Sequence, residues 1–408
     1  MSTNQIVMLL LDLALILALA GVFGAVARRL GQPPVVGEIF AGILVGPTLL
    51  HGALAHSLFP ADVRPLLSAL ANVGVALFMF LVGMELDHRA MRGRRGATIS
   101  VALVSTVLPF ALGAGLAQLL TSHQPPGQRL GFTLFLGVAM SVTAFPVLAR
   151  ILADRGMSDT PLGRLALASA AVGDVLAWSL LAVVVALAGG TTGSPWRVVL
   201  LIPYAALILL AGRPLLRRVL RPDTAAGGRF GIVLAGLLVS GALTEWMGLH
   251  FIFGAFLFGL AMPKDGAEPL RQDVARSLEK FCGVLLLPVF FVVSGLQVNL
   301  SLLGASGLGE FALIMLVAVA GKFTGAFGAA RLHGIEPRQA GALAVLMNTR
   351  GLTELVILTV GLNLGVLDTA LYSLMVAMAL VTTAATGPLL RLIYPARLLE
   401  PELLEAAR

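Results

Sequence analysis

The sequence predicts an all-α polytopic membrane protein with thirteen transmembrane helices. Three observations support this fold class: the strongly apolar composition, the regular recurrence of long apolar runs, and the side on which basic residues fall. Of the 408 residues, 58% are hydrophobic and 12% are charged, and the mean hydropathy of +0.95 is far above that of a soluble chain. The single cysteine, Cys282, excludes a disulfide framework and a multi-cysteine metal site.

Glycines, prolines and charge clusters divide the apolar runs into spans of about 20 residues, the length that crosses a bilayer core. The first run lacks a basic leader and an obvious cleavage site, so we interpret it as a retained helix. The thirteen predicted spans are 6–27, 34–50, 65–86, 97–120, 130–152, 161–188, 196–218, 229–246, 248–262, 278–299, 308–331, 338–362 and 369–393.

The basic residues support this count and orient the chain. Of the 28 Lys and Arg, 23 fall beside the loops after odd-numbered spans and at the C-terminus, 3 fall on the opposite side, and Lys322 and Arg350 lie inside spans. Because cytoplasmic loops are enriched in Lys and Arg, we expect the N-terminus outside and the C-terminus in the cytoplasm, in the inner membrane. The net charge of +7 therefore reflects membrane orientation, and no nucleic-acid partner is expected.

Three pairs of segments resemble each other in the same chain order. They are 77–87 with 289–299, 41–47 with 257–263, and 141–146 with 348–351. The offsets of 212, 216 and 207 pair spans that are seven apart. An odd separation reverses the direction of the copy, so the sequence predicts an inverted-topology repeat. This architecture is typical of secondary transporters, whose sites lie near the midplane.

Two spans at matching repeat positions carry signals of broken helices, in the runs Ser141-Val-Thr-Ala-Phe-Pro146 and Asn348-Thr-Arg-Gly-Leu-Thr353. Pro146 lacks a backbone donor, and Gly351 lowers the cost of leaving helical geometry. Unwound backbone within a membrane is tolerated only where it lines a cavity or packs against protein. The alternative is a simple proline kink in the first span and a helix that begins near Arg350 in the second.

Charged residues at membrane depth are the candidate functional groups. Asp174 lies near the middle of 161–187, where an acid costs about 2.5 to 3.5 kcal/mol on insertion scales. It is therefore an ion site, a proton site or one half of a structural ion pair. Lys322 is predicted at the same depth. Arg350 would neutralise the negative ends of the broken helices, and Glu354 would balance Arg350 or approach the positive ends.

Five runs, in this order, together resemble the monovalent cation:proton antiporter-2 family, including bacterial antiporter membrane domains and plant cation/proton exchangers. They are Pro33–Pro47, Phe80–Asp87, Ser141–Arg150, Gly321–Phe323 and Asn348–Leu355. The resemblance runs from about residue 6 to 394. It implies a homodimeric transporter without enzymatic activity or cofactor, formed by one transmembrane domain over 1–408. Helices 4–6 and 11–13 would form the ion-transporting core, helices 1–3 and 8–10 a dimerisation panel, and helix 7 a linker.

The resemblance also implies roles for individual residues. Asp174 would bind the cation and the proton alternately, and Thr143 and Ser141 would assist it. Lys322 would be the basic residue embedded in the membrane, and Arg350 the charge at the helix crossing. Asn348 and Glu354 would complete the charge-compensating group in the core.

Two departures from the family pattern matter. Gly173 stands where the family often has Asp or Asn, so this position offers only its backbone to the site. Lys322 therefore lacks its usual carboxylate neighbour, and would pair with Asp174 or rest elsewhere. About fourteen residues follow the last helix, so no soluble nucleotide-binding regulatory domain is expected.

We therefore expect exchange of Na⁺ or K⁺ for H⁺ by an elevator-type alternating-access mechanism, with one acid making the exchange electroneutral. Two other functions fit a related architecture. A sodium-coupled organic-solute symporter would have a roomier cavity and would not change the pH of a vesicle lumen. A gated cation channel would pass cations without coupling to protons.

Overall fold

A computed structural model describes residues 2–49, 52–85, 95–158, 160–188, 200–220, 226–248, 250–263, 268–302 and 304–395. This part of the chain folds into helices and turns, without a strand, so the all-α prediction is confirmed. It divides into two compact units. The first unit comprises Met1–Leu17, Pro60–Asp87 and Val185–Val293, and the second comprises Ala18–Phe59, His88–Val184 and Ser294–Arg408.

The multi-pass character predicted from hydropathy is confirmed. Within the described ranges, nine helices are long and apolar enough to cross a membrane, and a bent pair, Pro337–Met347 with Leu352–Asn363, makes a tenth. Two further apolar helices, Pro34–Val45 and Phe251–Ala261, are shorter. The start of the predicted span 196–218 lies outside the described residues. The count of thirteen and the division into panel, core and linker therefore stay predictions.

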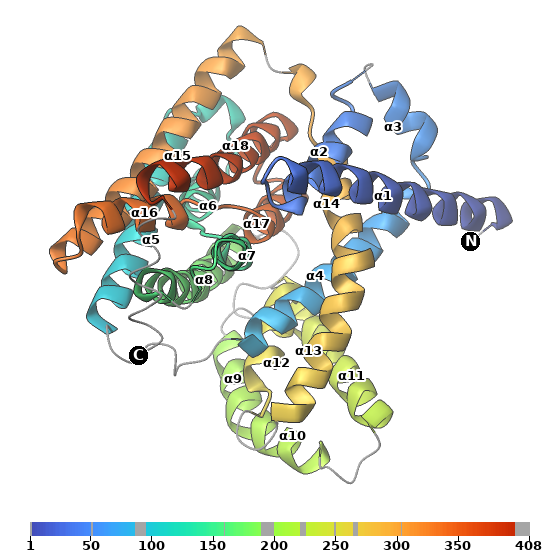
Figure 1. The fold of residues 1–408 in the computed structure, drawn as a ribbon. Helices are drawn as coiled ribbons and strands as arrows, with labels where there is room; N and C mark the ends of the chain where they lie inside the picture. The colour runs from blue at the N-terminus through green and yellow to red at the C-terminus, as the bar shows by residue number, and fades with distance from the viewer. Residues whose placement is uncertain are drawn as a thin grey trace. The chain divides into compact units, whose positions relative to one another are not determined.

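The first unit is built around α12, which packs against both α4 and α11 (Figure 1). A Cβ atom on Gly83 would lie 2.3 Å from the carbonyl oxygen of Phe256, so only a glycine allows this approach of α4 to α12. The elements are the N-terminal part of α1 (Thr3–Arg29), α4 (Arg64–Glu85), α9 (Leu201–Leu207), η5 (Ile208–Gly212), α10 (Arg213–Val219), α11 (Ala226–Trp246), α12 (Phe251–Ala261), α13 (Glu268–Phe281), η6 (Cys282–Leu286) and most of α14 (Leu287–Leu296).

One predicted boundary in this unit is wrong. The span expected to begin at 278 follows α13, which begins ten residues earlier, at Glu268. This helix is amphipathic: Leu270, Val274 and Leu278 are buried, and charged residues lie between them. A hydropathy average over such a stretch is low, so the helix was not visible as an apolar run.

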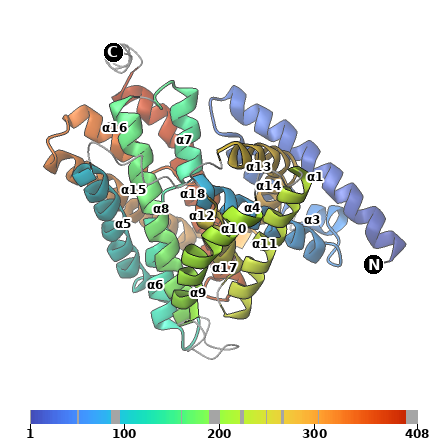
Figure 2. The same ribbon diagram turned by 90° about the horizontal axis from the view of Figure 1, so that it is seen from below.

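The second unit holds both broken helices. Its α5 and α15 lie side by side in both views (Figure 1 and Figure 2). A Cβ on Gly325 would lie 2.9 Å from the carbonyl oxygen of Val104, so α15 approaches α5 closely one turn from Lys322. The elements are the C-terminal part of α1, α2 (Pro34–Val45), α3 (Ala53–Leu58), α5 (Arg95–Ala117), η3 (Thr121–His123), α6 (Arg129–Ser141), α7 (Phe145–Asp154), α8 (Pro161–Ala188), the end of α14, η7 (Leu300–Leu302), α15 (Ala305–Leu332), α16 (Pro337–Met347), α17 (Leu352–Asn363) and α18 (Thr369–Ile393).

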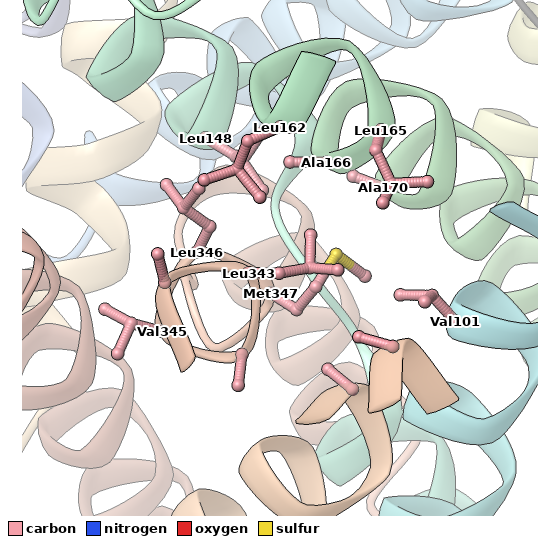
Figure 3. Packing of buried hydrophobic residues seen from close by; sticks show 14 of the residues in the cluster. Val101, Leu148, Leu162, Leu165, Ala166, Ala170, Leu343, Val345, Leu346 and Met347 are labelled. Atoms are coloured by element: carbon pink, nitrogen blue, oxygen red, sulfur yellow. The ribbon is translucent and has the colours of Figure 1, made fainter. Parts of the chain in front are cut away.

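An apolar cluster of the second unit packs half of each broken helix against α8. Leu148 of α7, Leu162 and Ala166 of α8, and Leu343 and Leu346 of α16 surround one buried region in Figure 3. These side chains are at most 4% exposed. The cluster gives α7, α8 and α16 a common core, and α8 is the helix that carries Asp174.

Candidate functional site

The first break separates α6 from α7. Helix α6 ends at Ser141, and α7 begins at Phe145, so three residues leave helical geometry. Pro146 lies in the first turn of α7, where a missing N–H costs nothing because that group has no intrahelical acceptor. The proline therefore starts the second half of the helix.

The second break separates α16 from α17 between Met347 and Leu352. A Cβ on Gly351 would lie 2.5 Å from Cγ2 of Val147. Gly351 is therefore required by close packing against α7. The sequence analysis had given another reason, the lower cost of leaving helical geometry.

The two breaks cross and bond to each other. The backbone N–H of Ala144 donates to the carbonyl of Thr349 at 2.9 Å. The hydroxyl of Thr143 donates to the carbonyl of Met347 at 2.8 Å. Unwound backbone from one helix thus supplies part of what the other needs, as a low-dielectric interior requires.

Arg350 is fully buried at this crossing. Its Nη1 donates to the carbonyl of Ala139 at 2.9 Å, and its Nη2 donates to the carbonyl of Met140 at 2.9 Å. These carbonyls belong to the last turn of α6, the negative end of that half-helix. Nη1 also donates to the carboxylate of Glu354 at 2.5 Å, so the buried charge has a partner of opposite sign.

Lys322 is 1% exposed and reaches the first break from α15. Its ammonium donates to the carbonyl of Ser141 and, at 2.7 Å, to the hydroxyl of Thr143. Of the two positions left open by the sequence, pairing with Asp174 or resting elsewhere, the structure has the second. The lysine therefore occupies the two oxygens that were expected to assist a bound cation.

Asp174 lies on α8 and is 1% exposed. Its Oδ1 is buried and has no hydrogen-bond partner. A Cβ on the neighbouring Gly173 would meet only Oγ1 of Thr106, at 3.9 Å, so the glycine leaves space beside the acid. A buried carboxylate oxygen without a partner is costly, and either a proton or a cation would remove that cost.

Three more buried side-chain oxygens on the second break and on α17 lack a hydrogen-bond partner: Asn348 Oδ1, Thr349 Oγ1 and Glu354 Oε1. Oxygen atoms of this kind are the ligands that hard cations prefer. Among the residues that the structure describes, no group of three or more His, Cys, Asp or Glu converges as a metal site. The oxygens near the breaks are thus amide, hydroxyl, carbonyl and carboxylate oxygens from separate elements.

With this geometry established, comparison with known proteins decides the family. Residues 14–394 match the family model described as the transmembrane sodium/hydrogen exchanger. The chain belongs to the sodium/hydrogen exchanger family.

Relatives of this exchanger-family chain differ in length. The Na⁺/H⁺ antiporter NhaS4 of Synechocystis is 41% identical over 97% of this chain and 99% of its own length. Cation/H⁺ antiporter 20 of Arabidopsis thaliana is 38% identical, and K⁺/H⁺ antiporter 1 of Saccharomyces cerevisiae is 32% identical. The chain spans 49% of the plant protein and 47% of the yeast protein.

The fold of this exchanger-family chain is also similar to a solved structure. The sodium proton antiporter MjNhaP1 of Methanocaldococcus jannaschii superposes with a TM-score of 0.68 over 98% of this chain and 99% of that chain. The sequence identity of 17% limits this likeness to the fold.

Sequence reasoning missed two threonines of this exchanger-family site. Thr383 of α18 donates to the carbonyl of Arg350 at 2.7 Å and accepts from its N–H at 3.1 Å. Thr349 contributes the carbonyl that joins the breaks. A signal was present for Thr383, because Thr382, Thr383 and Thr386 cluster in an otherwise apolar helix. Nothing in that pattern indicated the partner.

Proposed function

We propose that this chain is a secondary active transporter that exchanges Na⁺ or K⁺ for H⁺ across the membrane. The observation that carries the proposal is the buried Asp174 carboxylate with a partnerless oxygen, in a member of the sodium/hydrogen exchanger family. Relatives over nearly the whole chain are named as a Na⁺/H⁺ antiporter and a K⁺/H⁺ antiporter, which supports both candidate cations.

Competition at Asp174 would couple the two ions. Burial favours the neutral, protonated acid, whereas a dehydrated cation held by oxygen ligands favours the ionised carboxylate. The proton and the cation thus exclude each other. If the site faces each side in turn and moves only when occupied, the gradient of one ion drives the other.

Lys322 adds a third positive charge to this competition. The hydroxyl of Thr143 has one proton, which it donates to Met347, so its lone pairs are what Lys322 engages. A cation that uses Thr143 and the carbonyl of Ser141 must displace the ammonium. Lys322 would therefore hold these oxygens until a cation arrives, and would keep them from collapsing onto other donors.

The remaining features of the proposal follow from the number and place of these groups. One acid, Asp174, exchanges one cation for one proton, so transport moves no net charge. All the site residues lie in the second unit, and we assign this unit the role of ion carrier in an elevator-type mechanism. The transporter would be a homodimer in the inner membrane, with its N-terminus outside.

Reconstituted vesicles test the proposal. The full chain is placed in proteoliposomes containing a pH-sensitive dye, and Na⁺, K⁺ and Li⁺ are added in turn. We expect a cation-dependent pH change that an imposed membrane potential does not alter. A cation flux without a pH change would instead indicate a channel or a symporter, and a strong response to potential would reject electroneutrality.

Asp174→Asn tests the site. The variant keeps the side-chain shape but cannot ionise, so coupled exchange should disappear while the melting temperature in detergent is retained. Asp273→Asn, an exposed acid on α13, is the matched control and should keep full exchange. Exchange by Asp174→Asn at the control rate would refute the assignment.

A further inference from the structure

The second unit contains a surface cavity of about 360 Å³ that the proposed exchange does not use. It lies where the ends of three helices meet: the last turn of α1 and the turn after it, the end of α7, and the end of α18. In the predicted topology all three ends are on the cytoplasmic side. The lining residues are Arg28, Gly31, Gln32, Pro33, Pro34, Arg150, Ile151, Asp154, Arg155, Gly387 and Arg391.

Positive charge dominates this cavity. The lining has four arginines and one carboxylate, Asp154, which leaves a net charge of +3. Arg150 takes up that carboxylate, because its Nε lies 3.0 Å from Oδ1 of Asp154. No other lining residue can neutralise Arg28, Arg155 or Arg391. Such a field repels cations, so the cavity is not an entry route for the exchanged ion.

Two of the arginines are held close together by the fold. Nη2 of Arg155 donates to the carbonyl of Gly387 at 2.6 Å, which fixes this guanidinium against α18. A Cβ on Gly31 would lie 3.0 Å from Nη2 of Arg391, so the turn after α1 closely approaches this second guanidinium. Gly31 has a φ of +71°, a left-handed conformation that favours glycine.

The arrangement is electrostatically unfavourable without an anion. Burial, and then the neighbouring guanidinium of Arg391, lower the pKa of the Arg155 side chain. Gln32 adds a second unsatisfied group at the cavity: its Nε2 donates to the carbonyl of Ala384, but its Oε1 is buried without a partner. Basic residues at cytoplasmic helix ends are common in membrane proteins. Their usual placement spreads them into solvent, whereas here four converge on one concavity.

We propose that this cavity binds a phosphate-bearing anion, either the headgroup of an anionic lipid or a free phosphate compound. The planar guanidinium group forms paired hydrogen bonds with phosphate oxygens, which suits a site with several arginines. Basic pockets between helices at the cytoplasmic face are a recognised setting for anionic headgroups. A bound anion would join α1, α7 and α18, so it would stabilise the second unit.

Binding can be measured on the purified full chain in detergent, without a transport assay. The melting temperature is followed as sodium phosphate replaces sodium chloride at equal Na⁺ concentration and ionic strength. In a second arm, phosphatidylglycerol replaces phosphatidylcholine in mixed micelles. We expect the melting temperature to rise in at least one arm. A rise with inorganic phosphate identifies a free phosphate ligand, and a rise only with phosphatidylglycerol identifies a lipid headgroup.

The variant Arg155→Gln/Arg391→Gln should raise the half-saturating concentration of the active anion by about tenfold or more, because each lost arginine removes charge-assisted hydrogen bonds. Arg164→Gln/Arg338→Gln removes two exposed arginines from the same predicted side and should leave the response unchanged. The single variant Arg28→Gln provides the same comparison if the double variant does not fold. The proposal is overturned if neither anion raises the melting temperature, or if cavity and control variants respond alike.

Discussion

The two helix breaks of the second unit face the same problem and satisfy it with different groups. At the first break, the carbonyl of Ser141 and the hydroxyl of Thr143 accept from the ammonium of Lys322, which arrives from α15. At the second break, Arg350 pairs with Glu354 of the helix that follows, and Thr383 bonds both its N–H and its carbonyl.

The difference separates an exchangeable site from a fixed one. An ammonium on a flexible four-carbon stem is a point charge that another cation can replace. A guanidinium with a buried carboxylate and two carbonyl acceptors cannot leave without stranding several polar groups. We infer that the second break anchors the crossing and that the first exchanges its ligands. Four variants test this contrast.

The largest effect is expected from Arg350→Met. Glu354 would be left as a buried charge without its partner, and the carbonyls of Ala139 and Met140 would lose their donors. Breaking a buried pair in this way costs about 3–5 kcal/mol. We expect a large fall in melting temperature and in the yield of folded protein. Arg350→Met/Glu354→Leu should recover part of the loss, and wild-type stability in the single variant would contradict an anchoring role.

Thr383→Val should have the next largest effect. The substitution keeps the side-chain shape but removes the hydroxyl that bonds both backbone groups of Arg350, at a cost of about 1–3 kcal/mol. Thr382→Val is the matched control, because that hydroxyl donates only to carbonyls of its own helix, Met378 and Ala379. Equal melting temperatures for the two variants would show that Thr383 does not hold the second break.

Lys322→Met should change stability less, by about 1 kcal/mol, because one buried charge is removed together with its hydrogen bonds. Its main effect should be on ion binding. Without the competing ammonium, the half-saturating cation concentration in the vesicle assay should fall severalfold. Lys280→Met, at an exposed position on α13, is the control. An unchanged or higher half-saturating concentration would show that Lys322 does not compete with the cation.

The smallest effect is expected at His123, outside the membrane spans and away from both breaks. Its Nδ1 lies 2.7 Å from Asp368 and its Nε2 lies 3.0 Å from Glu310. Burial lowers the pKa of His123, but the hydrogen bonds and charges of Asp368 and Glu310 outweigh it, so the pKa is raised above 6.5.

The imidazolium at His123 therefore stabilises the fold fully below pH 6.5, and this stabilisation is lost as the pH rises through the raised pKa. The wild type should lose slightly more melting temperature than His123→Gln as the pH rises above 6.5. Parallel pH profiles for the two proteins would rule out this contribution.

The sequence by itself determined the features that depend on neighbouring residues. Apolar runs are a local property, so the multi-pass helical fold followed from hydropathy. Pro146 and Gly351 are local signals, and both breaks occur beside them. Asp174 was recognised because an acid in a long apolar run has few explanations. Helix α13 escaped the same method because its apolar residues are spaced along one face.

Only the tertiary structure decided which group serves which. Lys322 and Ser141 are 181 positions apart in the chain, and Arg350 and Ala139 are 211 apart. No local pattern specifies contacts at such separations, because they depend on how α5, α6, α15 and the two breaks pack. The arginine cavity likewise exists only where α1, α7 and α18 end together. The physical reason is that a charge inside a low-dielectric interior takes the nearest available partner, and the fold determines which partner is nearest.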